Sequence, residues 1–299
     1  MQIVKLMGGF ANQLREYVYG KYLQYCTGET IYYDDSWFFL GKAHNGYELQ
    51  RVFGLNLHLI SKYFQTTMFS KILKERKPVY QVLYDIGVDI DLVLAYAGED
   101  VPFTGHTICF DKQTAFASVS NSRYHWTYAG EYADYYAQIK DVLDRELIFP
   151  PFPDKKSRSL AEEIGDSDSV GIHIRRGDFA EMGWLGSPEY YRKCIEYAER
   201  ELHPDGYYVF SDDVEYCRKH IDEYGFGLIK DKLIFVVGNR GLHDYIDFRL
   251  MTFCKHFIVA PRSSFSSCAC VFNKGLRTKI NWETVGMEFE DSFGRQKSE

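Results

Sequence analysis

The second half of the sequence alternates between short apolar runs and longer amphipathic segments, and this alternation restricts the fold more than any other feature. Short apolar runs are typical of strands, whereas the longer segments have helical spacing. We predict strands at 169–175, 207–211, 232–237, 256–261 and 278–281, separated by helices at 188–202, 214–224, 243–254 and 264–272. Strands and helices in this order form a parallel sheet, so the predicted fold class is α/β.

The first half begins in the same way but is less regular. Strands are expected at 2–7, 30–33, 81–84 and 106–110, and helices at 11–25, within 46–76 and at 129–147. Pro150, Pro151 and Pro153 follow, and neither a helix nor a central strand can accommodate them. We therefore predict two domains, 1–150 and 151–299, because a single hydrophobic core rarely grows beyond about 250–300 residues.

Composition and charge indicate the general class of protein. The 299 residues are 45% hydrophobic and 26% charged, as in ordinary globular proteins. The net charge of −7 argues against a surface that binds nucleic acid. No apolar run reaches the roughly 18 residues of a membrane span, and Gly8-Gly9 comes too early for a secretory signal. Seven scattered cysteines fit reduced thiols, so a soluble, cytoplasmic protein is expected.

The strongest cluster of polar residues is His173-Ile174-Arg175-Arg176-Gly177-Asp178, where the 169–175 strand ends. Alternate residues of a strand share a face, so His173 and Arg175 point one way and Arg176 the other. Ligands of parallel sheets bind at the carboxyl ends of strands, where a guanidinium can hold a phosphate through two hydrogen bonds. The alternative is a structural ion pair between Arg176 and Asp178.

Three further clusters also follow strands. Serines at 263, 264 and 266 precede or open a helix, where they either bind an anion with the first free amides or simply cap the helix, and Arg262 is a further cation or a solvated loop residue. Asp212 and Asp213 either cap the next helix or accept hydrogen bonds from guanine N1 and N2. Gly8-Gly9 with Asn12-Gln13 either forms a tight turn or approaches a sugar or pyrophosphate.

Two short acidic patterns suggest metal-dependent chemistry. Asp89-Ile90-Asp91 and Asp166-Ser167-Asp168 match the Asp-x-Asp pattern of metal-using sugar transferases. The pattern arises often by chance, so we interpret both as surface acids. We expect no metal ion and no cofactor.

Taken together and in this order, the clusters resemble the motifs of the inverting α-1,2-fucosyltransferases and, more distantly, of the wider fucosyltransferase superfamily. Gly8-Gly9 with Asn12-Gln13 is similar to an amino-terminal Gly-Gly-x-x-Asn-Gln motif, and 173–179 to the signature His-x-Arg-Arg-x-Asp-Tyr/Phe. The segments 210–213, 247–256 and 263–266 are similar to the motifs that follow. Ala11 and the segment 267–271 depart from a family glycine and a Trp-rich run, which bears on the choice of acceptor.

The resemblance implies a GT-B fold, with two Rossmann-like domains that face each other across a cleft. The first domain would lie on the acceptor side, and the second would bind the sugar nucleotide. GDP-L-fucose would be the donor and a glycan hydroxyl the acceptor, with galactoside O-2 as the expected position. The fucose would pass to the acceptor by direct displacement with inversion.

The resemblance also implies roles for individual residues. Arg175 would stabilise negative charge on the departing β-phosphate in place of a metal, and Asp178 is a candidate general base. Residues expected to bind the donor are Gly9, Asn12, His173, Arg176, Asp212, Asp213, Ser263, Ser264, Phe265 and Ser266.

Two classes of alternative stay open at this point. The chain could be a transferase that is metal-dependent or uses another GDP-sugar. It could also be a non-catalytic module that binds a nucleotide or a sugar, as its aromatic content of 17% suggests.

Overall fold

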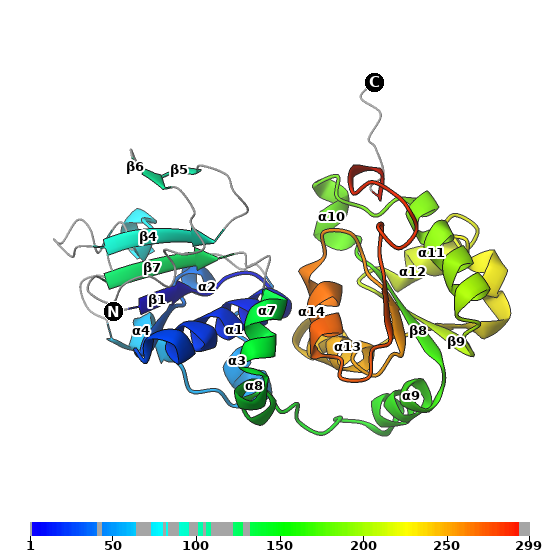
Figure 1. Ribbon diagram of the computed structural model, residues 1–299, viewed down its shortest axis with the longest axis horizontal. Helices are drawn as coiled ribbons and strands as arrows, with labels where there is room; N and C mark the ends of the chain where they lie inside the picture. The colour runs from blue at the N-terminus through cyan, green and yellow to red at the C-terminus, as the bar shows by residue number, and fades with distance from the viewer. Residues whose placement is uncertain are drawn as a thin grey trace. The chain divides into compact units, whose positions relative to one another are not determined.

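The chain folds into two compact units, Met1–Pro150 and Pro151–Glu299 (Figure 1). The structure is a computed structural model that describes residues 2–40, 44–63, 73–79, 82, 90–95, 101–103, 106–108, 122–127 and 132–292. The predicted strand at 81–84 lies outside these residues except for Val82, as does the end of the one predicted at 106–110. Each unit contains a five-stranded parallel sheet, which confirms the α/β class.

The sheet of the first unit has the strand order β3-β2-β1-β7-β4. Its strands are β1 (Gln2–Lys5), β2 (Ile31–Asp34), β3 (His58–Leu59), β4 (Ile90–Ala95) and β7 (Ser122–Thr127), and β5 (Val101–Phe103) pairs with β6 (His106–Ile108) in a separate antiparallel ladder. The helices are α1 (Phe10–Thr27), α2 (Trp37–Leu40), α3 (Leu49–Phe53), α4 (Ile60–Tyr63), α7 (Tyr132–Gln138) and α8 (Lys140–Glu146).

This unit differs from the sequence prediction in several places. The helix expected at 129–147 is divided into α7 and α8 at Ile139, whose φ of −120° is not helical. Strands β3, β4, β5 and β7 were not predicted, although β7 pairs with both β1 and β4. The sequence of β7 lacks the apolar run that is typical of a buried strand. It contains His125 instead, which is buried and forms hydrogen bonds with Tyr19 (2.8 Å) and Gln2 (2.7 Å).

The sheet of the second unit has the strand order β10-β9-β8-β11-β12. Its strands are β8 (Ser169–Ile174), β9 (Gly206–Ser211), β10 (Leu233–Phe235), β11 (His256–Ile258) and β12 (Thr278–Ile280). The α-helices are α9 (Lys155–Asp166), α10 (Gly177–Glu181), α11 (Pro188–Glu201), α12 (Val214–Lys219), α13 (Asp244–Met251) and α14 (Ser264–Phe272), and the 3₁₀ turns are η1 (Phe226–Lys232), η2 (Gly241–His243) and η3 (Glu290–Ser292).

The chain order places β8 at the centre of this sheet. The chain adds β9 and β10 on one side of β8 and then returns to add β11 and β12 on the other. The strand order therefore reverses between β8 and β11, and such a reversal opens a crevice for ligands at the carboxyl ends of the two strands. The turns after Ile174 and after Ile258 meet at this point.

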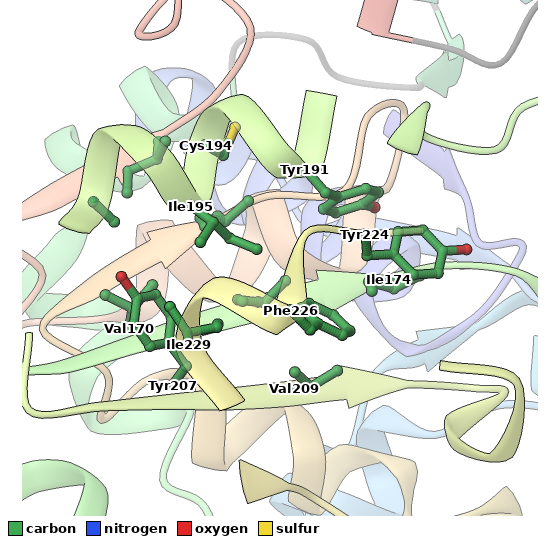
Figure 2. Close-up of a cluster of buried hydrophobic side chains, with 14 of the residues drawn as sticks. Val170, Ile174, Tyr191, Cys194, Ile195, Tyr207, Val209, Tyr224, Phe226 and Ile229 are labelled. Atoms are coloured by element: carbon green, nitrogen blue, oxygen red, sulfur yellow. The ribbon is translucent and has the colours of Figure 1, made fainter. Parts of the chain in front are cut away.

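Strand β8 is fixed by cores on both faces of the sheet, with α11 on one face and α13 and α14 on the other (Figure 1). Figure 2 shows Tyr191, Cys194 and Ile195 of α11 above β8 and β9, with Phe226 and Ile229 of η1 beside them. The Tyr191 hydroxyl donates to the carbonyl of His173 over 3.0 Å. A rigid strand therefore leads directly to Arg175.

Most predicted elements of this unit agree with the structure, but α10 and η1 were not predicted, and three further places differ. Helix α9 was not predicted, because it is strongly polar and buries little besides Ala161 and Ile164. It begins at Asp154, whose side chain accepts a hydrogen bond from the amide of Ser157 (2.8 Å). The segment 214–224 is helical only to Lys219, and η2 precedes α13 where the helix was expected to start.

Candidate functional site

The turn after β8 is organised by Asp212, the first residue after β9. One carboxylate oxygen of Asp212 accepts the amide of Arg176 (2.8 Å), and the other lies 2.9 Å from the Arg175 guanidinium. A side chain at Gly177 would begin 2.5 Å from that second oxygen. Glycine is therefore needed at 177 for the turn to approach Asp212 this closely.

Arg175 is held between two carboxylates. Its guanidinium donates to Asp178 over 2.7 Å and contacts Asp212 over 2.9 Å, while 29% of the side chain stays exposed. The alternative pairing of Arg176 with Asp178 is wrong, because α10 starts at Gly177 and places Asp178 three residues after Arg175 on the same turn. A guanidinium carries five N–H donors, so these two contacts orient it without exhausting its capacity.

Arg176 turns to different partners, as strand alternation predicts. Its guanidinium lies 3.2 Å from the centre of the Tyr216 ring and donates to the Tyr224 hydroxyl over 2.9 Å. The carboxylate of Asp213 is 3.6 Å away. The two tyrosines contact this charge, which indicates that Arg176 has a structural role in the turn.

The two aspartates after β9 both have structural partners. Asp213 caps α12, since its side chain accepts the amide of Tyr216 over 3.1 Å, and this confirms the capping interpretation for Asp213. Together with Asp178, three carboxylates surround the two guanidinium groups. The positive charges of Arg175 and Arg176 are therefore balanced by carboxylates that lie next to them.

His173 is a neutral, buried imidazole beside this turn. Only 5% of the residue is exposed, and its ring lies 5.7 Å from the ring of Phe265. Burial, with a smaller contribution from the Arg175 charge, lowers the pKa of His173 to about 3. The Nδ1 atom is buried and has no hydrogen-bond partner among the described residues. A buried nitrogen of this kind is a candidate to bind a polar ligand atom.

The start of α14 lies beside His173 through Phe265, which also contacts the ring of Phe248 at 5.3 Å. Ser263 occupies the N-cap position, but its side chain makes no capping hydrogen bond, so the expectation of a plain serine cap at this position is wrong. The hydroxyl of Ser266 is buried and accepts the amide of Ala260 over 3.2 Å. Ser266 therefore joins the helix to the end of β11, whereas Ser264 opens the helix.

The Gly8-Gly9 turn in the first unit is fixed mainly by Gln13. The Gln13 amide group donates to the carbonyls of Gly8 (3.0 Å) and Gly46 (2.9 Å) and accepts the amide of Glu48 (2.8 Å). These bonds occupy the side chain, so the expectation that Gln13 contacts a ligand is contradicted. Gly8 has a φ of +72°, which favours glycine.

Asn12 and Gly9 stay near the surface of that turn. A side chain at Gly8 would begin 2.5 Å from the Asn12 amide nitrogen, and one at Gly9 would begin 3.2 Å from the His44 ring. Gly9 is the N-cap residue of α1 and has an extended backbone. The turn therefore brings Asn12 and His44 close to the exposed main chain.

Asp247 is a perturbed carboxyl group that the sequence analysis did not single out as a site. Burial raises its pKa to about 7, against the hydrogen bond that it accepts from Asn239 over 2.7 Å. It lies in the first turn of α13. A shifted pKa of this kind is typical of functional positions, although structural networks also cause it. The sequence signal was its place in the 247–256 segment that resembles a family motif.

The acidic patterns do not form a metal site in the described part of the chain. No group of three or more His, Cys, Asp or Glu side chains there could hold a metal ion. Asp168 instead contacts Arg277 (2.9 Å) and His256 (3.2 Å), near the start of β8. Asp89 lies outside the described residues, and so does the side chain of Asp91.

The described residues include no helix that combines the length and the apolar character needed to cross a membrane.

The sequence is similar to two groups of sugar transferases. It is 33% identical over 138 residues to an alpha-1,2-colitosyltransferase of Escherichia coli, which covers 44% of this chain and 45% of that protein. It is 29% identical over 96 residues to galactoside alpha-(1,2)-fucosyltransferase 1 of Leontocebus fuscicollis, which covers 30% of this chain and 25% of that protein. Both alignments thus span less than half of the relatives' length.

Among solved structures, the chain is similar to NodZ alpha-1,6-fucosyltransferase soaked with GDP-fucose. The likeness covers 90% of this chain and 91% of that chain, with a TM-score of 0.54 and 14% sequence identity. With the two parallel sheets, it defines the fold as GT-B, as the sequence predicts. The sequence model of glycosyl transferase family 11 matches residues 103–296, well over half of the chain. The chain belongs to this family, which confirms the resemblance inferred from its motifs.

Proposed function

We propose that the protein is an inverting glycosyltransferase that moves L-fucose from GDP-L-fucose to a hydroxyl of a glycan, with galactoside O-2 as the expected position. The observation that carries the proposal is Arg175, a partly exposed guanidinium at the central crevice of the second sheet, oriented by Asp178 and Asp212. Membership of glycosyl transferase family 11 and relatives named for α-1,2 transfer support the chemistry.

The proposed reaction is a single displacement. The acceptor oxygen forms a bond to the anomeric carbon of fucose while the bond from that carbon to the β-phosphate oxygen breaks. GDP leaves with the electron pair, the acceptor hydroxyl releases its proton to solvent, and the configuration inverts from β to α. Arg175 stabilises the charge that grows on the β-phosphate, which for one well-placed donor is commonly worth about 3–4 kcal/mol.

The remaining residues of the turn would support Arg175 and bind the nucleotide. Asp178, expected as a candidate base, is assigned a positioning role here because its carboxylate is engaged by Arg175 at 2.7 Å. Asp212 fixes the turn, while Asp213 and Arg176 stabilise it from behind. These four residues therefore form the support on which the phosphate contact depends.

His173 and the start of α14 would complete the donor site. The unpartnered Nδ1 of His173 would take a hydrogen bond with the ribose or guanine. The first amides of α14 and the Ser264 hydroxyl would face the diphosphate, with Ser263, Phe265 and Ser266 holding the helix start in place. That Gly9 and Asn12 also contact the donor, as the resemblance implies, stays a prediction.

The proposal is tested with an acceptor array, GDP-L-fucose and mass spectrometry of the products. Expected is a mass increase of one deoxyhexose on β-galactosides, with slow release of GDP when no acceptor is present. Arg175→Lys at saturating donor serves as the matched variant and should lose turnover, because lysine keeps the positive charge but cannot form two parallel hydrogen bonds to a phosphate. Binding of GDP with neither transfer nor hydrolysis would instead support the non-catalytic module.

A second candidate function is transfer of a different deoxysugar. The similarity to an alpha-1,2-colitosyltransferase favours it, because that protein is named for another sugar. A donor screen that measures GDP release from GDP-L-fucose, GDP-colitose and GDP-mannose separates the two. A preference for GDP-colitose over GDP-L-fucose would replace fucose as the proposed donor sugar.

The same assay tests the prediction that no divalent ion is required. If Arg175 carries the phosphate charge, a chelator such as EDTA should leave the turnover unchanged. Loss of turnover with EDTA, restored by manganese, would favour the metal-dependent alternative.

A further inference from the structure

An aromatic surface continues from Arg175 to the loop between α10 and α11. The guanidinium of Arg175 lies 5.6 Å from the ring of Phe179, and this ring meets the ring of Trp184 edge to face, again at 5.6 Å. Trp184 lies between α10 and α11 and is 38% exposed. More than a third of this large apolar side chain therefore remains in contact with water, where a ligand can reach it.

Arg262 borders the same surface from the other side. Its guanidinium lies 5.4 Å from the Trp184 ring and 5.6 Å from the ring of Phe289. The backbone of Arg262 has a φ of +58°, a left-handed conformation that a side chain other than glycine rarely adopts. Strained residues of this kind gather at ligand sites, and here the strain turns an arginine towards an exposed tryptophan.

The segment that carries Trp184 is firmly anchored. The amide of Trp184 donates to the carbonyl of Phe179 over 2.9 Å, and the amide of Ser187 donates to that of Ser292 over 2.7 Å. A side chain at Gly186 would begin 2.7 Å from the Tyr191 ring and 3.0 Å from Pro261. The indole is therefore exposed on a rigid loop, which lowers the entropy cost of binding a ligand.

We propose that Phe179, Trp184, Arg262 and Phe289, here called the Trp184 platform, bind a sugar ring of the acceptor glycan. One face of a galactose ring presents aliphatic C–H groups, which stack on an indole, while its hydroxyls accept hydrogen bonds from a guanidinium. The platform offers both partners side by side. The inference rests on the proposed function, since it names the residues that would hold the second substrate. All four belong to the second unit, so the proposal adds an acceptor contact there to the acceptor role that the resemblance implies for the first.

The spacing from Arg175 assigns this surface to the acceptor. The donor sugar is bonded directly to the phosphate that Arg175 would hold, so we assign it to the space beside Arg175 and the first ring, Phe179. In an inverting displacement the acceptor oxygen attacks opposite the departing phosphate, so the acceptor ring lies one sugar further away. Trp184 is one ring contact of 5.6 Å beyond Phe179 and is therefore placed for that ring.

The test is binding of N-acetyllactosamine, a β-galactoside, by saturation-transfer NMR in the presence of saturating GDP. Trp184→Ala should raise the dissociation constant for the glycan by about tenfold, whereas the constant of Trp184→Phe should stay close to that of the parent protein. Arg262→Gly removes the guanidinium in a backbone conformation that glycine tolerates, and a several-fold loss is expected. Met182→Ala, an exposed position in the same loop, is the matched control and should change nothing.

Calorimetric titration with GDP separates this inference from the proposed function. The Trp184 and Arg262 variants should bind GDP as the parent protein does. Unchanged glycan binding by Trp184→Ala, equal losses of glycan and GDP affinity, or no glycan binding by the parent protein would each overturn the platform. A parent protein that neither binds GDP nor hydrolyses GDP-L-fucose would instead overturn the proposed donor.

Discussion

The turns after β1 and β8 occupy equivalent places in the two sheets, yet they direct their polar side chains in opposite ways. After β1, Gln13 and Glu16 point inward, and the Glu16 carboxylate accepts the amide of Met7 over 2.9 Å. After β8, Arg175 and Asp178 remain partly exposed. The difference teaches that the first turn uses buried polar groups to fix a main-chain path, whereas the second leaves charged groups partly exposed, as the proposed phosphate site requires.

The largest expected effect is that of Arg175→Lys on turnover. Lysine keeps the positive charge between Asp178 and Asp212 but cannot hold a phosphate through a fork. We expect kcat at saturating GDP-L-fucose to fall by about 10²–10³-fold. Arg200→Lys, at an exposed position on α11, is the control and should retain full activity. Near-parental turnover of Arg175→Lys would contradict the contrast between the two turns.

The next effect concerns stability and the first turn. Gln13→Ala removes a side chain that makes three hydrogen bonds, leaving buried main-chain groups of the turn unpaired. The expected cost is about 2–4 kcal/mol. It is measured as faster hydrogen exchange of the α1 amides. Gln24→Ala, exposed on the same helix, should cost less than about 0.5 kcal/mol. A Gln13→Ala protein with parental exchange would show that the turn does not depend on this side chain.

The fold and the site were predictable from the sequence to different degrees, for physical reasons. Local patterns located β8 and α14, because an apolar strand and a strand-to-helix turn depend on neighbouring residues. The role of Asp212 depends on the pairing of β9 with β8, which lies outside any local window. The same is true of β7, whose buried His125 is satisfied by partners far away in the sequence.

The site residues divide along the same line. The apolar run at 169–175 was sufficient to place Arg175 at the end of a strand, but not to show which aspartate it contacts. That choice depends on where α10 begins. Arg262 was noticed only as a cation of uncertain use, because its positive φ and its contact with Trp184 require the folded chain.

The two turns should also respond to pH with opposite sign. Burial depresses the pKa of His173 to about 3, so the unfolded chain binds this proton first as the pH falls below 6.5. His173 therefore favours the fold above that pH, and its contribution is lost between about 6.5 and 3. Burial raises the pKa of Glu16 well above 4.5, so the unfolded chain ionises first and stability falls as the pH rises above 4.5.

Hydrogen exchange at pH 4, 5.5 and 7 measures the two slopes separately, on α1 for Glu16 and on β8 for His173. Glu16→Gln should reduce the loss of stability at rising pH, and His173→Gln should reduce the loss at falling pH. Equal slopes in the parent protein and in both variants would show that neither buried group is linked to folding as its position indicates.

The smallest effect tests the charge balance of the second turn. Asp178 competes with a bound diphosphate for Arg175, and its side chain is 44% exposed. Asp178→Asn should therefore raise the affinity for GDP by up to about fivefold, since exposed ion pairs are worth about 0.2–1 kcal/mol.

The same change should lower kcat, because Arg175 then loses one of the two carboxylates that orient it. Calorimetric titration with GDP and turnover of GDP-L-fucose measure the two quantities on one sample. Weaker GDP binding by Asp178→Asn would mean that the carboxylate helps to build the phosphate site rather than competing for it.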